Sequence, residues 1–178
     1  MILEALGTLS YMCTIRPRLM KLRALLPEAK IHPAGSRYVC SPPVYGTDID
    51  FLIWSPVADI DAKLTLMGFE KSQFTEYFKS WNSIDDFWAW RRHNVNLIVT
   101  RSQCYAETFH TATHICKAKN LRHKEHRIAV HEGLRGNWEE HRYLVAEDNP
   151  LRSYIEQFTG PYGPTLQKAY RAKHGLTL

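Results

Sequence analysis

The sequence predicts an α+β fold, in which a mixed β-sheet is packed with helices and the C-terminal part is helical. Apolar residues recur at helical spacing near the N-terminus and again after residue 102, and strand-like runs lie between them. This order, helices then strands then helices, is typical of a sheet with helical cover. We therefore expect a core over residues 1–101 and a helical region over residues 102–178 packed on it.

The N-terminal residues predict two helices, divided near Pro17. A proline fits the first turn of a helix, because the N–H that it lacks is not needed there. The apolar part has no basic start before it, so we expect no secretory signal. The four cysteines form no CxxC pair, and no apolar run reaches the length of a membrane span. We therefore expect a cytoplasmic protein with reduced thiols and no membrane partner.

The middle of the chain predicts strands separated by turn signals. Residues 30–36, KIHPAGS, predict a short strand ending in a Gly-Ser turn, and residues 40–47, CSPPVYGT, predict a loop. The apolar run in residues 48–54, DIDFLIW, is typical of a buried central strand. Residues 56–69, PVADIDAKLTLMGF, predict a helix that starts near Pro56 and is closed by Gly68.

Further strands and helices follow. Residues 73–81 and 85–100 are expected to be extended, with a hairpin turn at His93-Asn94. Alternation then places Val95, Leu97 and Val99 on one face and Asn96 on the other. Beyond residue 102, helices are expected over residues 103–118, 123–136 and 164–174.

Two aspartates at the start of the central strand need a positive partner. Asp48 and Asp50 are two residues apart, so along a strand both side chains point to the same face and repel each other. Magnesium or manganese suits such a pair, because carboxylate and phosphate oxygens complete its shell. Backbone N–H groups at a Gly35-Ser36 turn and the Ser36 hydroxyl suit phosphate oxygens. Arg37 suits a phosphate as well, and an ordinary surface arginine is the equal alternative.

This spacing, Gly-Ser, eleven residues, then Asp-Ile-Asp-Phe, resembles the signature of the nucleotidyltransferase superfamily. Over residues 30–136 the chain also resembles small nucleotidyltransferase-like proteins of tailed bacteriophages. The resemblance implies a nucleotidyltransferase-like mixed sheet and a magnesium-dependent transfer of a nucleoside monophosphate from NTP to an unidentified acceptor, for which RNA, DNA and protein are the candidates. Asp48 and Asp50 would bind metal, and Lys117 would neutralise the triphosphate. A phage origin would place the protein in the host cytoplasm.

One position departs from the family. Active members usually carry a third carboxylate on a neighbouring strand, and Asn96 stands at the matching place. An amide oxygen can bind a metal or a nucleotide, but it carries no charge and cannot act as base. Asp85, Asp86 and Glu76 are possible bases by proximity in the chain. The alternative is a degenerate fold that binds nucleotide, nucleic acid or a host protein without turnover.

Three other features have both a functional and a structural interpretation. Residues 117–127, KAKNLRHKEHR, carry five Lys/Arg against one Glu and suit nucleic acid, but a solvated helical face is the plainer interpretation. His110 and His114 have the spacing of metal ligands on a helix, yet no third ligand is evident, so we expect packed or surface imidazoles. Trp88 and Trp90 suit stacking on a base, but we expect them to be structural.

Overall fold

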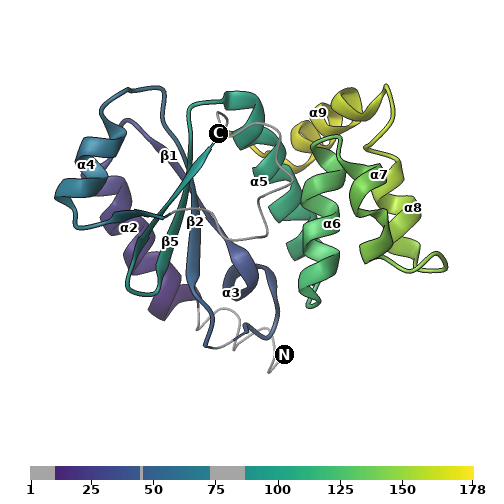
Figure 1. The fold of residues 1–178 in the computed structure, drawn as a ribbon, viewed down its shortest axis with the longest axis horizontal. Coiled ribbons are helices and arrows are strands. Elements are labelled where there is room, and N and C mark those ends of the chain that lie inside the picture. The colour runs from purple at the N-terminus through teal and green to yellow at the C-terminus, as the bar shows by residue number, and fades with distance from the viewer. Residues whose placement is uncertain (1–10, 45, 73–86) are drawn as a thin grey trace. The chain divides into compact units, whose positions relative to one another are not determined.

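A computed structural model describes residues 11–44, 46–72 and 87–178 of the chain. It has a five-stranded mixed sheet and helices, with a helical C-terminal part, which confirms the predicted α+β class (Figure 1). The chain divides into two compact units, Met1–Ala106 and Glu107–Leu178, with the boundary inside helix α5. Among the described residues, no helix has both the length and the apolar character needed to cross a bilayer.

The first unit contains the sheet and the helices around it. In chain order its elements are η1 (Tyr11–Ile15, a π-helical turn), α2 (Arg16–Leu25), β1 (Lys30–Ala34), α3 (Gly35–Val39), β2 (Ile49–Trp54), α4 (Ile60–Leu66), β3 (Glu70–Ser72), β4 (Trp88–Arg92), β5 (Val95–Thr100) and the start of α5 (Gln103–Ala118). Pro17 lies in the first turn of α2, as predicted. The residues expected to be extended at 73–81 lie outside the described part of the chain.

The strand order is β1-β2-β5-β4-β3, so β2 and β5 are interior strands. β2 and β5 run parallel, and the other neighbouring pairs are antiparallel. The predicted central strand is therefore confirmed in β2. β4 and β5 form a hairpin in which Arg92 pairs with Val95, which confirms the turn at His93-Asn94.

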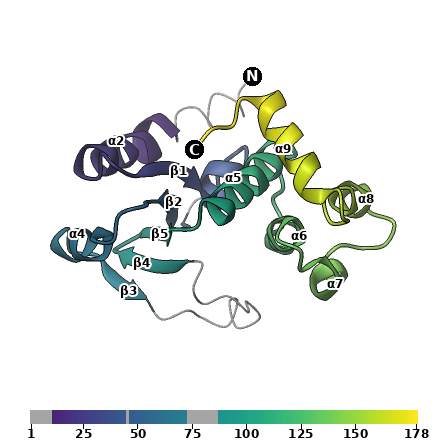
Figure 2. The ribbon, with the colours of Figure 1, turned by 90° about the horizontal axis from the view of Figure 1, so that it is seen from above.

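One face of the sheet carries the core of this unit. Ile49, Phe51 and Ile53 of β2 are each at most 1% exposed and pack in a cluster with Leu97 and Val99 of β5. Helices α2 and α4 contribute to the same cluster, and Figure 2 shows both on one side of the sheet. Because side chains alternate along a strand, residues 50 and 96 face the opposite side.

Two local expectations about this unit were wrong. The Gly-Ser dipeptide does not end a strand in a plain turn, because β1 leads directly into α3, which begins at Gly35. Helix α4 begins at Ile60 and not near Pro56, so the residues between them precede the helix. Gly68, with φ +76°, does follow its end.

The second unit is helical in its described residues. It comprises most of α5, followed by α6 (Lys124–Leu134), α7 (Trp138–His141), the 3-10 turn η3 (Arg142–Leu144), α8 (Pro150–Glu156) and α9 (Gly163–His174). The predicted helices at 103–118, 123–136 and 164–174 correspond to α5, α6 and α9 within two residues at each end. Asn149 caps α8, because its side-chain oxygen accepts a hydrogen bond from the Leu151 N–H.

Candidate functional site

A row of polar side chains crosses the face of the sheet opposite the core. The register pairs Ala34 of β1 with Asp50 of β2, Asp50 with Asn96 of β5, and Asn96 with Arg91 of β4. Directly paired residues point to the same face of a sheet. Asp50, Asn96 and Arg91 therefore lie side by side at the end of the sheet where β2 begins, and Asp48 precedes β2 by one residue.

The Asn96 amide joins the two aspartates. Its Nδ2 donates to Asp48 Oδ2 over 3.0 Å and to Asp50 Oδ1 over 3.2 Å. The reverse orientation of the amide would place its oxygen against carboxylate oxygens, which repel it. Both aspartates are thus held on one face, and a neutral donor lies between them.

Arg91 supplies the positive charge that the aspartates need within the protein. Its Nη2 lies 3.0 Å from Asp48 Oδ2, the oxygen that also accepts from Asn96. The side chains of Arg91 and Asp48 are 56% and 33% exposed, so this ion pair contributes at most about 1 kcal/mol to stability. Sequence reasoning missed Arg91. The signal was present, because a hairpin turning at His93-Asn94 makes Arg91 the cross-strand partner of Asn96.

Gly35 brings the backbone against Asp50. Its φ is +70°, a conformation that side chains disfavour, and a Cβ placed there would lie 1.8 Å from Asp50 Oδ2. Only glycine fits a backbone that approaches a carboxylate this closely. The start of α3 and the aspartate pair therefore form one site.

Ser36 ties the intervening loop to this site. Its Oγ donates to Thr47 Oγ1 over 3.2 Å, and Thr47 Oγ1 donates to the Val44 carbonyl over 2.8 Å. These hydrogen bonds tie the first turn of α3 to Thr47, the residue that precedes Asp48. Arg37 is half-buried, and its Nε has no hydrogen-bond partner among the described residues.

The structure does not place the other candidate residues at this site. Lys117 is in the last turn of α5, in the second unit, and its role toward a triphosphate stays a prediction. The possible bases Glu76, Asp85 and Asp86 lie outside the described residues.

The contacts of the His114, Trp88 and Trp90 side chains show whether these residues are packed within the protein. His114 Nδ1 lies 3.0 Å from the Tyr170 hydroxyl, and its ring packs on Tyr170 and His174, so it is a packed imidazole as expected. Trp90 is 4% exposed in the core, and Trp88 packs against that core and donates to Asp61 Oδ1 over 2.7 Å. Both tryptophans are structural, as predicted.

The donor set of the aspartate site suits a hard divalent cation. Magnesium binds proteins through one or two carboxylates and takes its remaining ligands from water and phosphate. Asp48 and Asp50 supply those carboxylates from one face, and a rotated Asn96 amide would add a neutral oxygen. The described residues contain no group of three His, Cys, Asp or Glu placed to hold a metal alone. A metal here would therefore depend on phosphate oxygens from a nucleotide.

Comparison of the sequence with models of protein families and with curated proteins found no match. The case for a function is therefore made from the residues of this site.

Proposed function

We propose that the chain is a magnesium- or manganese-dependent nucleotidyltransferase, which moves a nucleoside monophosphate from NTP to an RNA, DNA or protein acceptor. One observation carries the proposal: Asp48 and Asp50 share the Asn96 amide on one face of the sheet, and Gly35 contacts Asp50. Paired carboxylates next to a close-approaching backbone are what a metal-bound triphosphate requires.

Each residue has a stated part in the proposal. Asp48 and Asp50 would hold the cation, whose charge offsets that of the triphosphate. Gly35 and Ser36 would donate to phosphate oxygens, and Arg37 would add a guanidinium. Rate enhancement would come mainly from positioning and charge neutralisation. Asn96 cannot accept the proton of the acceptor hydroxyl, so the base must be another group.

A second candidate is a degenerate site that binds nucleotide without turnover. A specific observation favours it: Arg91 and Asn96 satisfy the carboxylates with protein donors. Asp48 then needs no metal, and a cation competes with Arg91 for Asp48 Oδ2. The two candidates share the binding step and differ only in transfer.

Binding and transfer should be measured separately. Calorimetry with NTP and magnesium or manganese tests binding, and labelled NTP with RNA, DNA and protein acceptors tests transfer. We expect Asp48→Asn with Asp50→Asn to abolish metal-dependent NTP binding. Asp59→Asn with Asp61→Asn is the matched control, because it removes two charges two residues apart near α4 and should leave NTP binding unchanged.

The outcomes separate the candidates. Transfer by the wild-type chain that is lost in the Asp48/Asp50 variant supports the enzyme. Metal-dependent NTP binding without transfer on any acceptor supports the degenerate site. Unchanged NTP affinity in the Asp48/Asp50 variant contradicts both, because both place the nucleotide at these carboxylates.

A further inference from the structure

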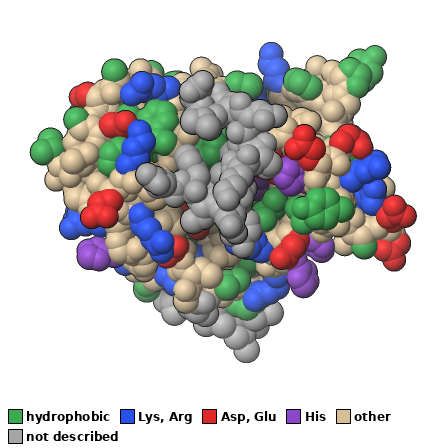
Figure 3. Space-filling model, viewed as in Figure 1, with side chains coloured by type: hydrophobic (Ala, Val, Ile, Leu, Met, Phe, Trp, Pro, Cys, Tyr) green, Lys and Arg blue, Asp and Glu red, His purple; other side chains and the backbone are tan. Residues whose placement is uncertain are grey.

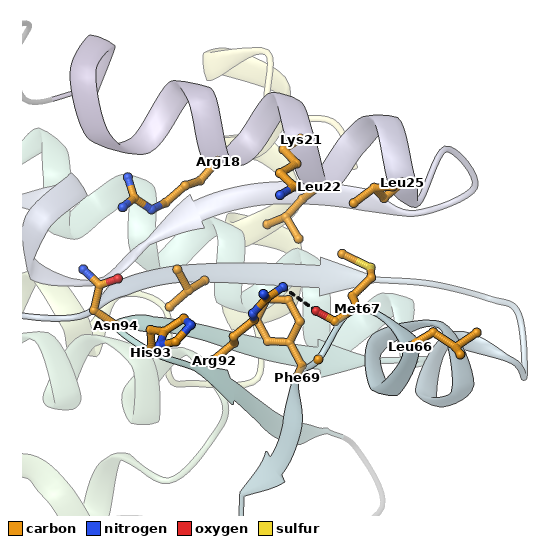
Figure 4. A pocket seen from close by; sticks show the side chains of 12 residues that line it. Arg18, Lys21, Leu22, Leu25, Leu66, Met67, Phe69, Arg92, His93 and Asn94 are labelled. Carbon is orange, nitrogen blue, oxygen red and sulfur yellow. Dashed lines mark hydrogen bonds between the residues drawn. The ribbon is translucent and has the colours of Figure 1, made fainter.

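The first unit contains a second candidate site, on the core side of the sheet. A pocket of about 550 Å³ lies between α2, the end of α4 and the β4–β5 turn (Figure 4). This volume is within the range of small-molecule sites, about 300–1,000 Å³. Val95 lines the pocket from the core face, whereas Asn96, the next residue, belongs to the aspartate site on the opposite face. The two sites are therefore separate.

The pocket has an apolar floor. Leu22 and Phe69 belong to the buried core, and Val95 packs against it. Two more leucines line the pocket with unusual exposure, Leu25 at 48% and Leu66 at 88%. Apolar side chains left in contact with water on a concave surface favour an apolar ligand.

The rim of the pocket is cationic. Arg18, Lys21 and Arg92 line it together with His93, and no Asp or Glu is among its lining residues. Arg92 Nη1 donates to the Met67 carbonyl over 2.5 Å, which places its guanidinium across the pocket from α2. The side chains of Lys21 and His93 have no hydrogen bond or ion pair with another described residue. This unbalanced positive charge favours an anion.

We propose that this pocket binds a small amphipathic anion, with an apolar body on the floor formed by Leu22, Phe69 and Val95 and a phosphate or carboxylate at the Arg18–Lys21–Arg92 rim. The size of the pocket favours a small molecule over an acidic helix of a partner protein, since a helix requires an extended groove. A nucleoside monophosphate and a medium-chain fatty carboxylate share the required chemistry, and the experiment distinguishes them.

The test uses 1-anilinonaphthalene-8-sulfonate, a fluorescent aromatic anion, on the full chain in EDTA. EDTA removes divalent cations, so metal-dependent binding at Asp48 and Asp50 does not contribute. We expect saturable fluorescence enhancement that AMP or decanoate displaces, and the effective competitor identifies the ligand class. Failure of the proposed nucleotidyl transfer would leave this result unaffected.

Substitutions at two exposed residues that line the pocket test whether the probe binds there. Lys21→Gln should weaken probe binding about three- to tenfold, and Leu66→Asp should weaken it at least tenfold, because a carboxylate would then stand at the rim. Lys168→Gln and Met20→Asp are the matched controls, since both residues are exposed and neither lines the pocket. Circular dichroism checks that all four variants fold.

The proposal is overturned by any of three results. The first is the absence of saturable probe binding to the wild-type chain. The second is equal binding by Leu66→Asp and Met20→Asp. The third is displacement by an acidic amphipathic peptide and by neither small anion, which would assign the surface to a protein partner.

Discussion

The Asn96 amide lies at the centre of the candidate site, and its hydrogen bonds explain how two aspartates coexist there. A bound divalent cation would replace these donors, so protein and metal compete for the same carboxylate oxygens. Metal binding at this site therefore depends on how easily the hydrogen bond from Asn96 and the ion pair with Arg91 are broken at Asp48.

Asn96→Asp tests this balance directly. Without metal, the variant would add a third carboxylate next to Asp48 and Asp50, and we expect it to unfold about 1–2 kcal/mol more easily in EDTA. With manganese the variant should be more stable than the wild-type chain, because the added negative charge strengthens metal binding. If the native site is degenerate, the variant should also gain nucleotidyl transfer, whereas an enzyme with its base elsewhere should show equal or lower transfer.

Thermal unfolding with and without manganese measures the effect. Asn94→Asp is the control, because it adds the same charge at the exposed turn residue. An equal response of the two variants to manganese would contradict a metal site at Asp48 and Asp50.

Gly35 provides a second test at the residue scale. Gly35→Ala should destabilise the fold and weaken NTP binding, because the new Cβ would displace the Asp50 carboxylate. Gly46→Ala is a matched control: its φ is +78°, but nothing lies within 4 Å of the added Cβ. We expect about 1 kcal/mol of backbone strain for Gly46→Ala and about 2 kcal/mol more for Gly35→Ala. Urea denaturation measures both, and equal losses would show that the approach to Asp50 is unimportant.

At the scale of elements, the β4–β5 hairpin serves both faces of the sheet. Arg91 and Asn96 belong to the aspartate site, while Arg92 and Val95 line the pocket. The hairpin is short, with two residues between its paired ends, so its register is set by the turn. A one-residue slip would exchange the faces and dismantle both sites.

Helix α5 leads to a prediction about pH. Burial, together with the nearby charges of His114 and Arg171, lowers the pKa of His110 to about 4. The unfolded chain binds this proton near pH 6.5, whereas the folded chain stays neutral until about pH 4. The stability that His110 contributes is therefore fully present above pH 6.5 and falls as the pH drops toward 4, by at most about 1.4 kcal/mol per pH unit.

His110→Gln should reduce this pH dependence, while the exposed His123→Gln should not. Part of the dependence should remain in His110→Gln, because burial also lowers the pKa of His131, to about 3. Urea midpoints between pH 4 and 7 give the dependence, and an NMR titration of His110 gives its pKa. A His110 pKa near 6.5 in the folded chain would contradict the prediction.

At the scale of the whole molecule, the charge distribution limits nucleic-acid binding. The net charge is +5, and the basic stretch 117–127 carries five Lys/Arg. Some of this charge is engaged within the protein: Lys119 Nζ lies 3.7 Å from the centre of the Tyr154 ring, and Arg127 donates to the Leu121 and Arg122 carbonyls. On the face drawn in Figure 3, Lys and Arg side chains are interspersed with Asp and Glu.

We therefore expect weak, salt-sensitive binding to nucleic acid. Five phosphate contacts would give a slope of about −4.5 in log K against log salt concentration, and we expect a shallower slope. Fluorescence anisotropy with labelled duplex DNA and RNA measures it. A slope of −4.5 or steeper would favour the whole basic stretch as a nucleic-acid surface.

The sequence by itself determined those secondary-structure elements whose signal lies within a few consecutive residues. The apolar run of β2, the turn at His93-Asn94 and the helical spacing in α5 were readable because each signal spans a few residues. Alternation also placed Asn96 on the face opposite Leu97. The same local signals misjudged the start of α4 and the helix at Gly35, where tertiary packing outweighs weak propensity.

Only the tertiary structure decided which strands lie side by side. β2 and β5 are parallel neighbours although paired residues such as Ile49 and Val95 are 46 positions apart in the chain, and that pairing brings Asn96 and Arg91 to Asp48 and Asp50. The contact between Gly35 and Asp50 likewise depends on the register of β1 with β2. Strand order and register are set by the burial of whole faces, which no short stretch of sequence contains.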